Sequence, residues 1–322
     1  MQIRWYHNNQ GPIISTTKEQ VIEIDGSYFK DLAGTGEFLP YEDWRLPANT
    51  RAEDLAKRLS IEEMAGLMLY SSHQMIPGRA GNVFSAKYGG RDYDKTVNQP
   101  WELSDLQIEF LSKDHLRHVL VVKYENIETA VEWNNNMQTL VENQPWGIPI
   151  NFSSDPRHSA EESTAEYKNT AADTSKWPGG IGISATFSPV TCKMFAEIAS
   201  KEYRALGITT SLAPQVDLAT EPRWMRAVDT FGGQTELALA MAKAYCDGMQ
   251  TTIGSDTGWG SESVISMAKH WPGGGTGEGG RDAHYWFGKY NVYPGESFLE
   301  HLKPFTEGAL SLEGPTKQAR AI

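Results

Sequence analysis

Apolar residues follow two different spacings along the chain, one typical of helices and one typical of buried strands. Four segments repeat apolar residues every three or four positions and are predicted to be amphipathic helices: residues 127–141, 189–206, 236–249 and 298–310. Four short apolar runs lie before or between them and are predicted to be strands: residues 117–122, 148–152, 208–216 and 264–268. Since strands alternate with helices, we predict an α/β fold with a parallel sheet.

Capping residues mark the starts of two helices. Ser60 and Glu63 have the spacing of a capping box, in which the serine accepts from an amide of the first turn and the glutamate reaches back. The apolar run over residues 64–69 continues that helix. Ser188 precedes Pro189, and proline suits the first helical position because the N–H group that it lacks would be unpaired there.

The number of strand–helix units bears on the domain organisation. The chain has 322 residues, and a single α/β barrel commonly takes about 250. Residues 1–50 mix short apolar segments with Gly, Pro and polar residues and are predicted to form an N-terminal extension, followed by one α/β unit over residues 51–322. About five strand–helix units can be counted, whereas a closed (β/α)8 barrel needs eight.

Composition and charge exclude two classes of partner. No apolar run approaches the ~18 residues that a membrane span needs, so we expect no membrane association. The net charge of -12, without any cluster of Lys and Arg, argues against binding of nucleic acid. The N-terminus lacks an apolar signal core, and a cytoplasmic location is therefore expected.

The cysteines and the aromatic residues suggest different roles. Cys192 and Cys246 fall in predicted helices and lack the spacing of a metal site, so we expect buried free thiols rather than a disulfide. Aromatic residues make up 11% of the chain, and tryptophan can stack on the apolar face of a sugar ring. We nevertheless expect most of the ten tryptophans to be structural.

The candidate chemistry centres on one stretch, residues 267–284, Met-Ala-Lys-His-Trp-Pro-Gly-Gly-Gly-Thr-Gly-Glu-Gly-Gly-Arg-Asp-Ala-His. A predicted strand ends at Lys269 and His270, and the proline and glycines that follow exclude regular structure. Ligands of parallel α/β folds bind at the carboxyl ends of the strands, where the loops converge. An ammonium group beside an imidazole suits a ligand with adjacent hydroxyl groups.

Three blocks, in the same order, resemble family 3 glycoside hydrolases. Residues 269–273, Lys-His-Trp-Pro-Gly, resemble the family's Lys-His-Phe-Pro-Gly signature. Residues 217–226, Asp-Leu-Ala-Thr-Glu-Pro-Arg-Trp-Met-Arg, with Thr-Phe-Gly at 230–232, resemble its Asp-Pro-Arg-Trp-Gly-Arg block. Residues 147–155, Gly-Ile-Pro-Ile-Asn-Phe-Ser-Ser-Asp, resemble the loop with its substrate-binding aspartate. With weaker matches, the resemblance covers roughly residues 60–305.

The resemblance implies a (β/α)8 TIM-type barrel, of which this chain would be an incomplete N-terminal portion. It implies a retaining exo-glycosidase that hydrolyses terminal β-D-glucosyl residues of a β-glucoside or oligosaccharide, without a cofactor. Four residues are implied to bind hydroxyl groups in the −1 sugar pocket: Asp155, Arg223, Lys269 and His270. Four further residues are implied to support them: Asp217, Arg226, Arg157 and His158. Asp217, at a strand end near two arginines, is expected to hold their guanidinium groups.

Asp282 and His284 have more than one interpretation. The β-N-acetylglucosaminidase branch of the family uses an Asp-x-His dyad after the Lys-His motif, and the aspartate orients a histidine that acts as general acid/base. The spacer before Asp282 is longer here, and its Glu-Gly-Gly-Arg sequence looks more like the β-glucosidase branch. His284 is therefore an acid/base, a substrate or loop contact, or neither.

The family's nucleophile is an aspartate in a Ser-Asp-Trp-like block, and this block does not occur in the sequence. We therefore expect the enzyme to need a C-terminal segment of the same protein, for example as a second chain, and a homo-oligomer is a further possibility. Residues 312–320 have the composition of an exposed, protease-sensitive tip.

Two alternatives to the β-glucosidase stay open. One is a sugar-binding homologue without catalysis, and the other is a β-N-acetylglucosaminidase-type enzyme that uses Asp282 and His284. A metal-dependent or phosphate-processing enzyme is disfavoured, because the sequence lacks clustered ligands, and no metal site is predicted.

Overall fold

The computed structural model describes residues 3–19, 21–79, 84–159 and 174–322 and divides the chain into two compact units. The first unit comprises residues 1–120 and 127–151, and the second comprises residues 121–126 and 152–322. The predicted division at residue 50 stays a prediction. Across the described residues, no helix combines the length and apolar character needed to cross a membrane.

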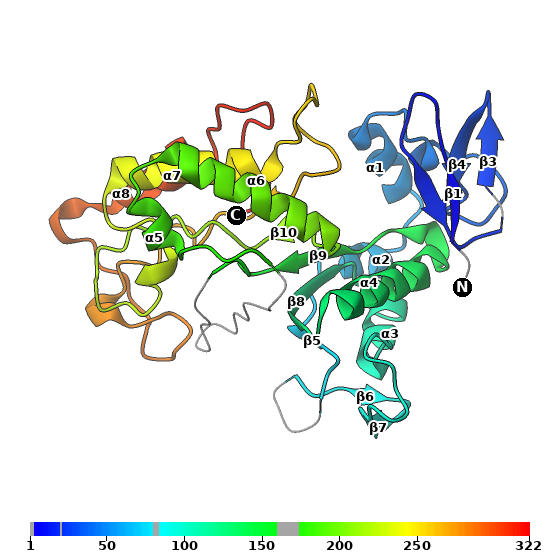
Figure 1. The fold of residues 1–322 in the computed structure, drawn as a ribbon, viewed down its shortest axis with the longest axis horizontal. Coiled ribbons are helices and arrows are strands. Elements are labelled where there is room, and N and C mark those ends of the chain that lie inside the picture. The colour runs from blue at the N-terminus through cyan, green and yellow to red at the C-terminus, as the bar shows by residue number, and fades with distance from the viewer. Residues whose placement is uncertain (1–2, 20, 80–83, 160–173) are drawn as a thin grey trace. The chain divides into compact units, whose positions relative to one another are not determined.

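The described residues of the first unit form short hairpins, four α-helices and two short 3-10 turns (Figure 1). Its strands are β1 (Arg4–Tyr6), β2 (Ile14–Thr16), β3 (Val21–Ile24), β4 (Ser27–Lys30), β5 (Gln74–Ile76), β6 (Lys87–Tyr88) and β7 (Arg91–Asp92). Its helices are α1 (Ala48–Ala56), α2 (Ile61–Leu67), α3 (Asp105–Ser112) and α4 (Ile127–Glu142), with the short 3-10 turns η1 (Pro40–Glu42) and η2 (Pro145–Gly147). Strands β1 and β2, β3 and β4, and β6 and β7 form antiparallel pairs.

The second unit carries most of the parallel sheet and the longest helix. Its strands are β10 (Thr210–Ser211) and β11 (Ile265–Ser266), and the unit boundary passes through β8 (His118–Tyr124) and β9 (Asn151–Ser154). Its helices are α5 (Gly180–Ser184), α6 (Pro189–Ala205), α7 (Thr235–Gln250) and α8 (Phe298–Lys303), with the turns η4 (Ala227–Asp229), η5 (Glu278–Gly280) and η6 (Pro294–Glu296) and the π-helical segment η7 (Pro304–Ala309).

The parallel sheet confirms the predicted α/β class. The strand order is β11-β10-β9-β8-β5, and β10 pairs in parallel with both β9 and β11. Helix α4 follows β8, α6 follows β9 and α7 follows β10, so strands and helices alternate as expected. The closed (β/α)8 barrel stays a prediction.

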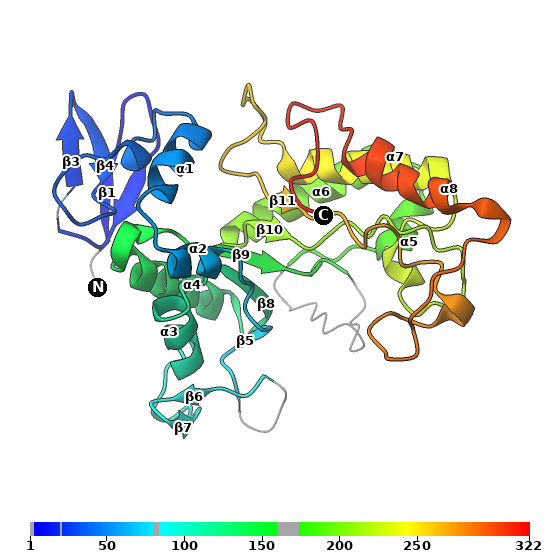
Figure 2. The same ribbon diagram turned by 180° about the vertical axis from the view of Figure 1, so that it is seen from behind.

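Helices α6 and α7 pack side by side, as both views show (Figures 1 and 2). The buried residues of each helix recur at helical spacing: Cys192, Ala196, Ala199 and Tyr203 in α6, and Ala238, Met241, Ala242, Tyr245 and Cys246 in α7. Both cysteines are buried free thiols, which confirms the expectation for them. Burial of these small and apolar side chains stabilises the second unit.

Local signals predicted the helix starts correctly. The hydroxyl of Ser60 accepts from the backbone N–H of Glu63, whose carboxylate accepts from the backbone N–H of Ser60 at 2.8 Å. The hydroxyl of Ser188 accepts from the backbone N–H of Thr191, and Pro189 begins α6. These contacts satisfy amides of the first helical turn, which have no partner within the helix.

Four predicted elements differ from the structure, and the first is the strand expected over 148–152, which is β9 at Asn151–Ser154. The strands expected over 208–216 and 264–268 are each reduced to two residues, β10 and β11. Pro214 lacks an N–H group for the ladder, and parallel pairing resumes only as an isolated bridge between Gln215 and Lys269. The helix expected over 298–310 is α8 followed by the π-helical η7. The change occurs at Pro304, which has no N–H group to continue the α-helical hydrogen bonds.

The exposed tip predicted over residues 312–320 is confirmed in part, because five of its nine residues are exposed and three others are buried. Thr316 is 1% exposed, and the backbone N–H of Gly314 donates to both carboxylate oxygens of Asp247 in α7 at 3.1 Å. Beyond this turn, Ala321 pairs in parallel with Met267 at the end of β11. The segment is held by contacts from distant residues, which its polar composition did not reveal.

Candidate functional site

The candidate site lies in the second unit, after the carboxyl ends of three parallel strands. Asp155 directly follows β9, Asp217 lies in the segment after β10, and Lys269 and His270 lie just after β11. Because parallel strands run in the same direction, their carboxyl ends meet at one edge of the sheet. The structure brings these residues together in two pairs, Lys269 with Asp155 and His270 with Asp217.

Lys269 and Asp155 form a short, partly buried ion pair. Nζ of Lys269 donates to Oδ1 of Asp155 at 2.7 Å, and the two side chains are 14% and 19% exposed. The backbone carbonyl of Asp155 accepts from the Tyr203 hydroxyl at 2.7 Å, which anchors the turn after β9. A cationic donor and an anionic acceptor thus lie side by side, and both can bind hydroxyl groups.

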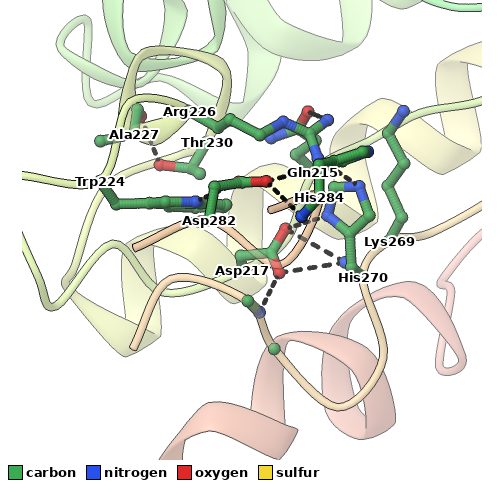
Figure 3. Close-up of polar contacts among 12 residues, drawn as sticks. Gln215, Asp217, Trp224, Arg226, Ala227, Thr230, Lys269, His270, Asp282 and His284 are labelled. Carbon is green, nitrogen blue, oxygen red and sulfur yellow. Dashed lines mark hydrogen bonds and ion pairs between the residues drawn. The ribbon is translucent and has the colours of Figure 1, made fainter. Parts of the chain in front are cut away.

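Asp217 holds the loop that carries His270 (Figure 3). Its buried carboxylate accepts from the backbone N–H groups of His270 and Gly274, and its Oδ2 lies 3.1 Å from Nδ1 of His270. Burial raises the pKa of Asp217, but the hydrogen bonds from His270 and Gly274 outweigh burial, so the pKa lies below its usual value.

The contacts of Asp217 differ from the expected ones. Its hydrogen-bond partners are in the loop after β11 instead of the two arginines, because β11 is the direct neighbour of β10 in the sheet. The carboxylate therefore fixes the backbone and the ring of His270.

Arg226 contacts His270 on its other ring nitrogen (Figure 3). Nη1 of Arg226 lies 2.9 Å from Nε2 of His270, Nη2 donates to Oε1 of Gln215 at 2.8 Å, and Arg226 is 6% exposed. Arg223, in contrast, directs its guanidinium to the carboxylate of Glu221 at 2.8 and 2.7 Å, and its side chain is 71% exposed. The polar cluster around His270 therefore contains Arg226 and not Arg223.

One sequence signal could have distinguished the two arginines. A tryptophan within a polar segment is expected to be at least partly buried because of its large apolar area. Trp224 and Arg226 are both buried, whereas Arg223 and Met225 are exposed. Burial thus alternates along this segment. The expected burial of Trp224 therefore indicates that Arg226, two positions further on, is buried and that the adjacent Arg223 is exposed. No comparable signal pointed to Gln215, whose role depends on its contact with Arg226.

Arg157 and His158 brace the turn that follows β9. Arg157 is 2% exposed, and its guanidinium donates to the Ser154 hydroxyl and the Val121 carbonyl, both at 2.7 Å. Nε2 of the buried His158 lies 2.8 Å from Oε2 of Glu202. Burial lowers the pKa of His158, although the Glu202 carboxylate opposes this shift. Both side chains are embedded behind the site.

Asp282 and His284 form a dyad, and Trp224 hydrogen-bonds the same aspartate (Figure 3). Nδ1 of His284 lies 2.6 Å from Oδ1 of Asp282, and the indole N–H of Trp224 donates to Oδ2 at 2.7 Å. Burial raises the pKa of Asp282, but hydrogen bonds from His284 and Trp224 outweigh burial and lower the pKa below its usual value. The side chain of His284 is 70% exposed, so its ring is accessible. Sequence analysis missed the contact with Trp224.

The site combines carboxylate, ammonium, guanidinium and imidazole groups from loops at one edge of the sheet (Figure 3). Such groups can hydrogen-bond a neutral, hydroxyl-rich ligand with charged donors and acceptors. In the part of the chain that the structure describes, no group of three or more His, Cys, Asp or Glu side chains is placed to hold a metal ion.

The chain is similar to known proteins in sequence. Residues 94–310 match the model of the glycosyl hydrolase family 3 N terminal domain. The chain is 37% identical over 297 residues to a periplasmic beta-glucosidase/beta-xylosidase of Dickeya chrysanthemi, covering 92% of this chain and 42% of that protein. It is 36% identical to a probable beta-glucosidase C of Aspergillus oryzae, covering 82% of this chain and 38% of that protein.

A solved structure, described as a novel b-glucosidase from Erythrobacter marinus, shares the fold with a TM-score of 0.60 at 20% identity. The match covers 84% of this chain and 32% of that one. The chain thus spans less than half the length of the relatives that it matches. From the family match and the identity over most of its length, this chain belongs to glycoside hydrolase family 3 and includes residues of the family's N-terminal domain.

Proposed function

We propose that the full-length protein is a retaining exo-glycosidase that releases terminal β-D-glucosyl residues, and that this chain supplies its −1 sugar pocket. The observation that carries the proposal is the Lys269–Asp155 pair beside the Asp217–His270–Arg226 cluster, at the carboxyl ends of parallel strands. The printed names of two relatives, a beta-glucosidase/beta-xylosidase and a probable beta-glucosidase, support the choice of substrate.

Each charged group has a proposed task toward the sugar. The Asp155 carboxylate accepts hydrogen bonds from hydroxyl groups, and the Lys269 ammonium group donates to a neighbouring one. Arg226 takes the role that the sequence suggested for Arg223, because Arg223 is exposed and bound to Glu221. Charged hydrogen bonds that strengthen as the sugar distorts favour the transition state over the ground state.

The two catalytic carboxyl groups of a retaining glycosidase stand about 5 Å apart and act as nucleophile and as acid/base. We place the nucleophile in a C-terminal segment of the same protein, since the relatives extend well beyond the region that they share with this chain. We also propose that this segment completes a (β/α)8 barrel.

The test is hydrolysis by the full-length protein, followed by proton NMR of the sugar that is released. With an aryl β-D-glucoside we expect β-D-glucose as the first product, before mutarotation, because two inversions at the anomeric carbon retain its configuration. The α anomer as first product would contradict the retaining mechanism. Glucose binding in calorimetry without any hydrolysis would favour a sugar-binding homologue instead.

The Asp282–His284 dyad supports a second candidate, a β-N-acetylglucosaminidase-type enzyme in which His284 is the general acid/base. Under the first proposal, His284→Ala should change kcat/KM for the aryl glucoside by less than about tenfold, because the ring serves only as a contact. Under the second, the full-length protein should cleave aryl N-acetyl-β-D-glucosaminide, and the same substitution should lower kcat by about 10²-fold or more. Glu278→Ala, in the exposed pair with Arg281, is the control.

A further inference from the structure

The loop over residues 285–290 exposes four aromatic side chains in the second unit. Trp286 is 82% exposed, and three others have exposed fractions between 46% and 67%: Tyr285, Phe287 and Tyr290. Single exposed apolar residues are common on protein surfaces, but an exposed group of them is typical of a binding surface.

Three of these rings contact one another. The rings of Tyr285 and Phe287 are stacked, with centroids 5.2 Å apart and an angle of 2° between their planes. The rings of Trp286 and Phe287 meet edge to face, with centroids 5.7 Å apart and an angle of 75°. Aromatic pairs prefer these two arrangements, so the rings hold one another in place before any ligand binds. We call Tyr285, Trp286 and Phe287 the aromatic platform.

Two successive turns of the backbone present the platform. The backbone N–H of Tyr285 donates to the carbonyl of Asp282 at 3.1 Å, and that of Gly288 donates to the carbonyl of Tyr285 at 2.8 Å. A Cβ atom at Gly288 would collide with the carbonyl oxygen of Asp282, so this close approach requires glycine. Because a preformed surface loses little conformational entropy on binding, these turns favour recognition of a ligand.

The base of the loop is joined to the glycine-rich segment of the candidate site. The backbone N–H of Glu278 donates to the carbonyl of Tyr290 at 2.9 Å, and the side-chain amide of Asn291 donates to the carbonyl of Gly273 at 3.2 Å. Gly273 is the last residue of the Lys-His-Trp-Pro-Gly block at 269–273. The platform is therefore fixed to the loop that carries the proposed sugar pocket.

The composition of the loop favours a flat ligand. Residues 284–290, His-Tyr-Trp-Phe-Gly-Lys-Tyr, include four aromatic residues and no aliphatic one. Aliphatic side chains would serve an apolar contact with another protein equally well, whereas a flat ring matches the apolar C–H face of a pyranose. Lys289 is also exposed and adds a donor for hydroxyl groups. A sugar ring thus suits this surface better than an aliphatic protein surface does.

We propose that the aromatic platform binds a sugar ring of the leaving group, next to the glucosyl residue in the −1 pocket. Trp286 has the largest exposed fraction and stacks on that sugar, and Phe287 supports the indole from the side. The inference rests on the proposed function and names the class of substrate, which is a β-linked oligosaccharide rather than a glucoside of a small alcohol.

The contact can be measured at Trp286 itself, without hydrolysis. N-bromosuccinimide oxidises accessible indoles, and trypsin releases Trp286 in residues 282–289 as the single tryptophan of that peptide. Trp5, which is 64% exposed in the first unit, is the single tryptophan of residues 5–18 and serves as the reference in the same digest. Mass spectrometry therefore gives the ratio of the two oxidation rates in one sample.

In full-length protein, thiocellobiose or thiolaminaribiose should lower this ratio about threefold or more, because a bound sugar ring covers the indole face. Their sulfur-bridged bonds resist hydrolysis, so the ligand stays intact. Glucose fills only the −1 pocket and should leave the ratio unchanged. Protection of Trp286 by neither disaccharide would overturn the inference. So would a Trp286 that is oxidised more than about tenfold more slowly than Trp5 without sugar, because another part of the protein would then cover the platform.

Hydrolysis by variants of the full-length protein gives a second readout. Trp286→Ala should lower kcat/KM for cellobiose or laminaribiose about tenfold and for methyl β-D-glucoside less than about threefold, since only the disaccharides reach the platform. Trp286→Phe retains a ring and should recover part of the loss. Trp5→Ala is the matched control and should change neither value. An equal loss on both kinds of substrate would indicate a structural role and overturn the inference.

The two readouts keep this inference separate from the proposed function. If the wild-type protein hydrolyses no glucoside but a thio-linked disaccharide protects Trp286, the proposed function fails and the platform stands as a sugar-binding surface. If the wild-type protein hydrolyses an aryl glucoside but neither disaccharide protects Trp286, the platform fails while the proposed function stands.

Discussion

Replacing Lys269 with methionine is expected to lower kcat/KM of the full-length protein for an aryl β-D-glucoside by about 10²- to 10³-fold. Nζ of Lys269 lies 2.7 Å from Oδ1 of Asp155, and both side chains are less than one-fifth exposed. Loss of one partner of a largely buried, hydrogen-bonded charge pair typically costs about 2–5 kcal/mol. The substitution also removes the cationic donor that we assign to a sugar hydroxyl.

A matched control is available in the first unit. Lys87 and Asp92 form an ion pair of the same 2.7 Å length, but their side chains are 57% and 54% exposed. Lys87→Met should therefore leave kcat/KM unchanged, since exposed pairs contribute little. The assignment of Lys269 to the sugar pocket fails if Lys269→Met retains more than about a third of wild-type activity while its circular dichroism spectrum is unchanged.

The second large effect is expected on stability, from Asp217→Ala. The carboxylate is fully buried and accepts from two backbone N–H groups and one ring N–H of the loop after β11. Alanine leaves these donors unpaired in the interior, and we expect the free energy of unfolding to fall by about 3 kcal/mol or more. Urea titration followed by tryptophan fluorescence measures this change, and Glu278→Ala serves as a surface control.

Asp217 also predicts a pH dependence with a definite sign. Its folded pKa lies below the value of about 3.9 for an unfolded aspartate. The unfolded state therefore binds the proton more readily, so the stability from this carboxylate is present above about pH 4 and is lost as the pH falls through the folded pKa. Asp217→Asn lacks this titration and should show a weaker loss of stability below pH 4. An identical acid dependence in wild type and Asp217→Asn would contradict the assignment.

The class of fold and several helix boundaries could be predicted because their signals are local. Apolar spacing reports which face of a helix is buried, and a capping box such as Ser60 with Glu63 satisfies amides only a few residues away. Strand lengths were overestimated at β10 and β11, since pairing depends on neighbours far away in the sequence. The anchoring of the turn after η7 could not be predicted for the same reason, because its partner, Asp247, lies in α7.

The amino-acid sequence by itself determined the family resemblance and the residues that reach the carboxyl ends of the strands, among them Asp155, Lys269 and His270. Which partner each residue has was decided by tertiary structure. Arg223 and Arg226 are three positions apart and chemically identical, yet one binds Glu221 at the surface and the other binds His270 in the interior. The physical reason is that hydrogen bonds form over about 3 Å, and only folding brings β10 and β11 together so that Asp217, His270 and Arg226 come within that distance.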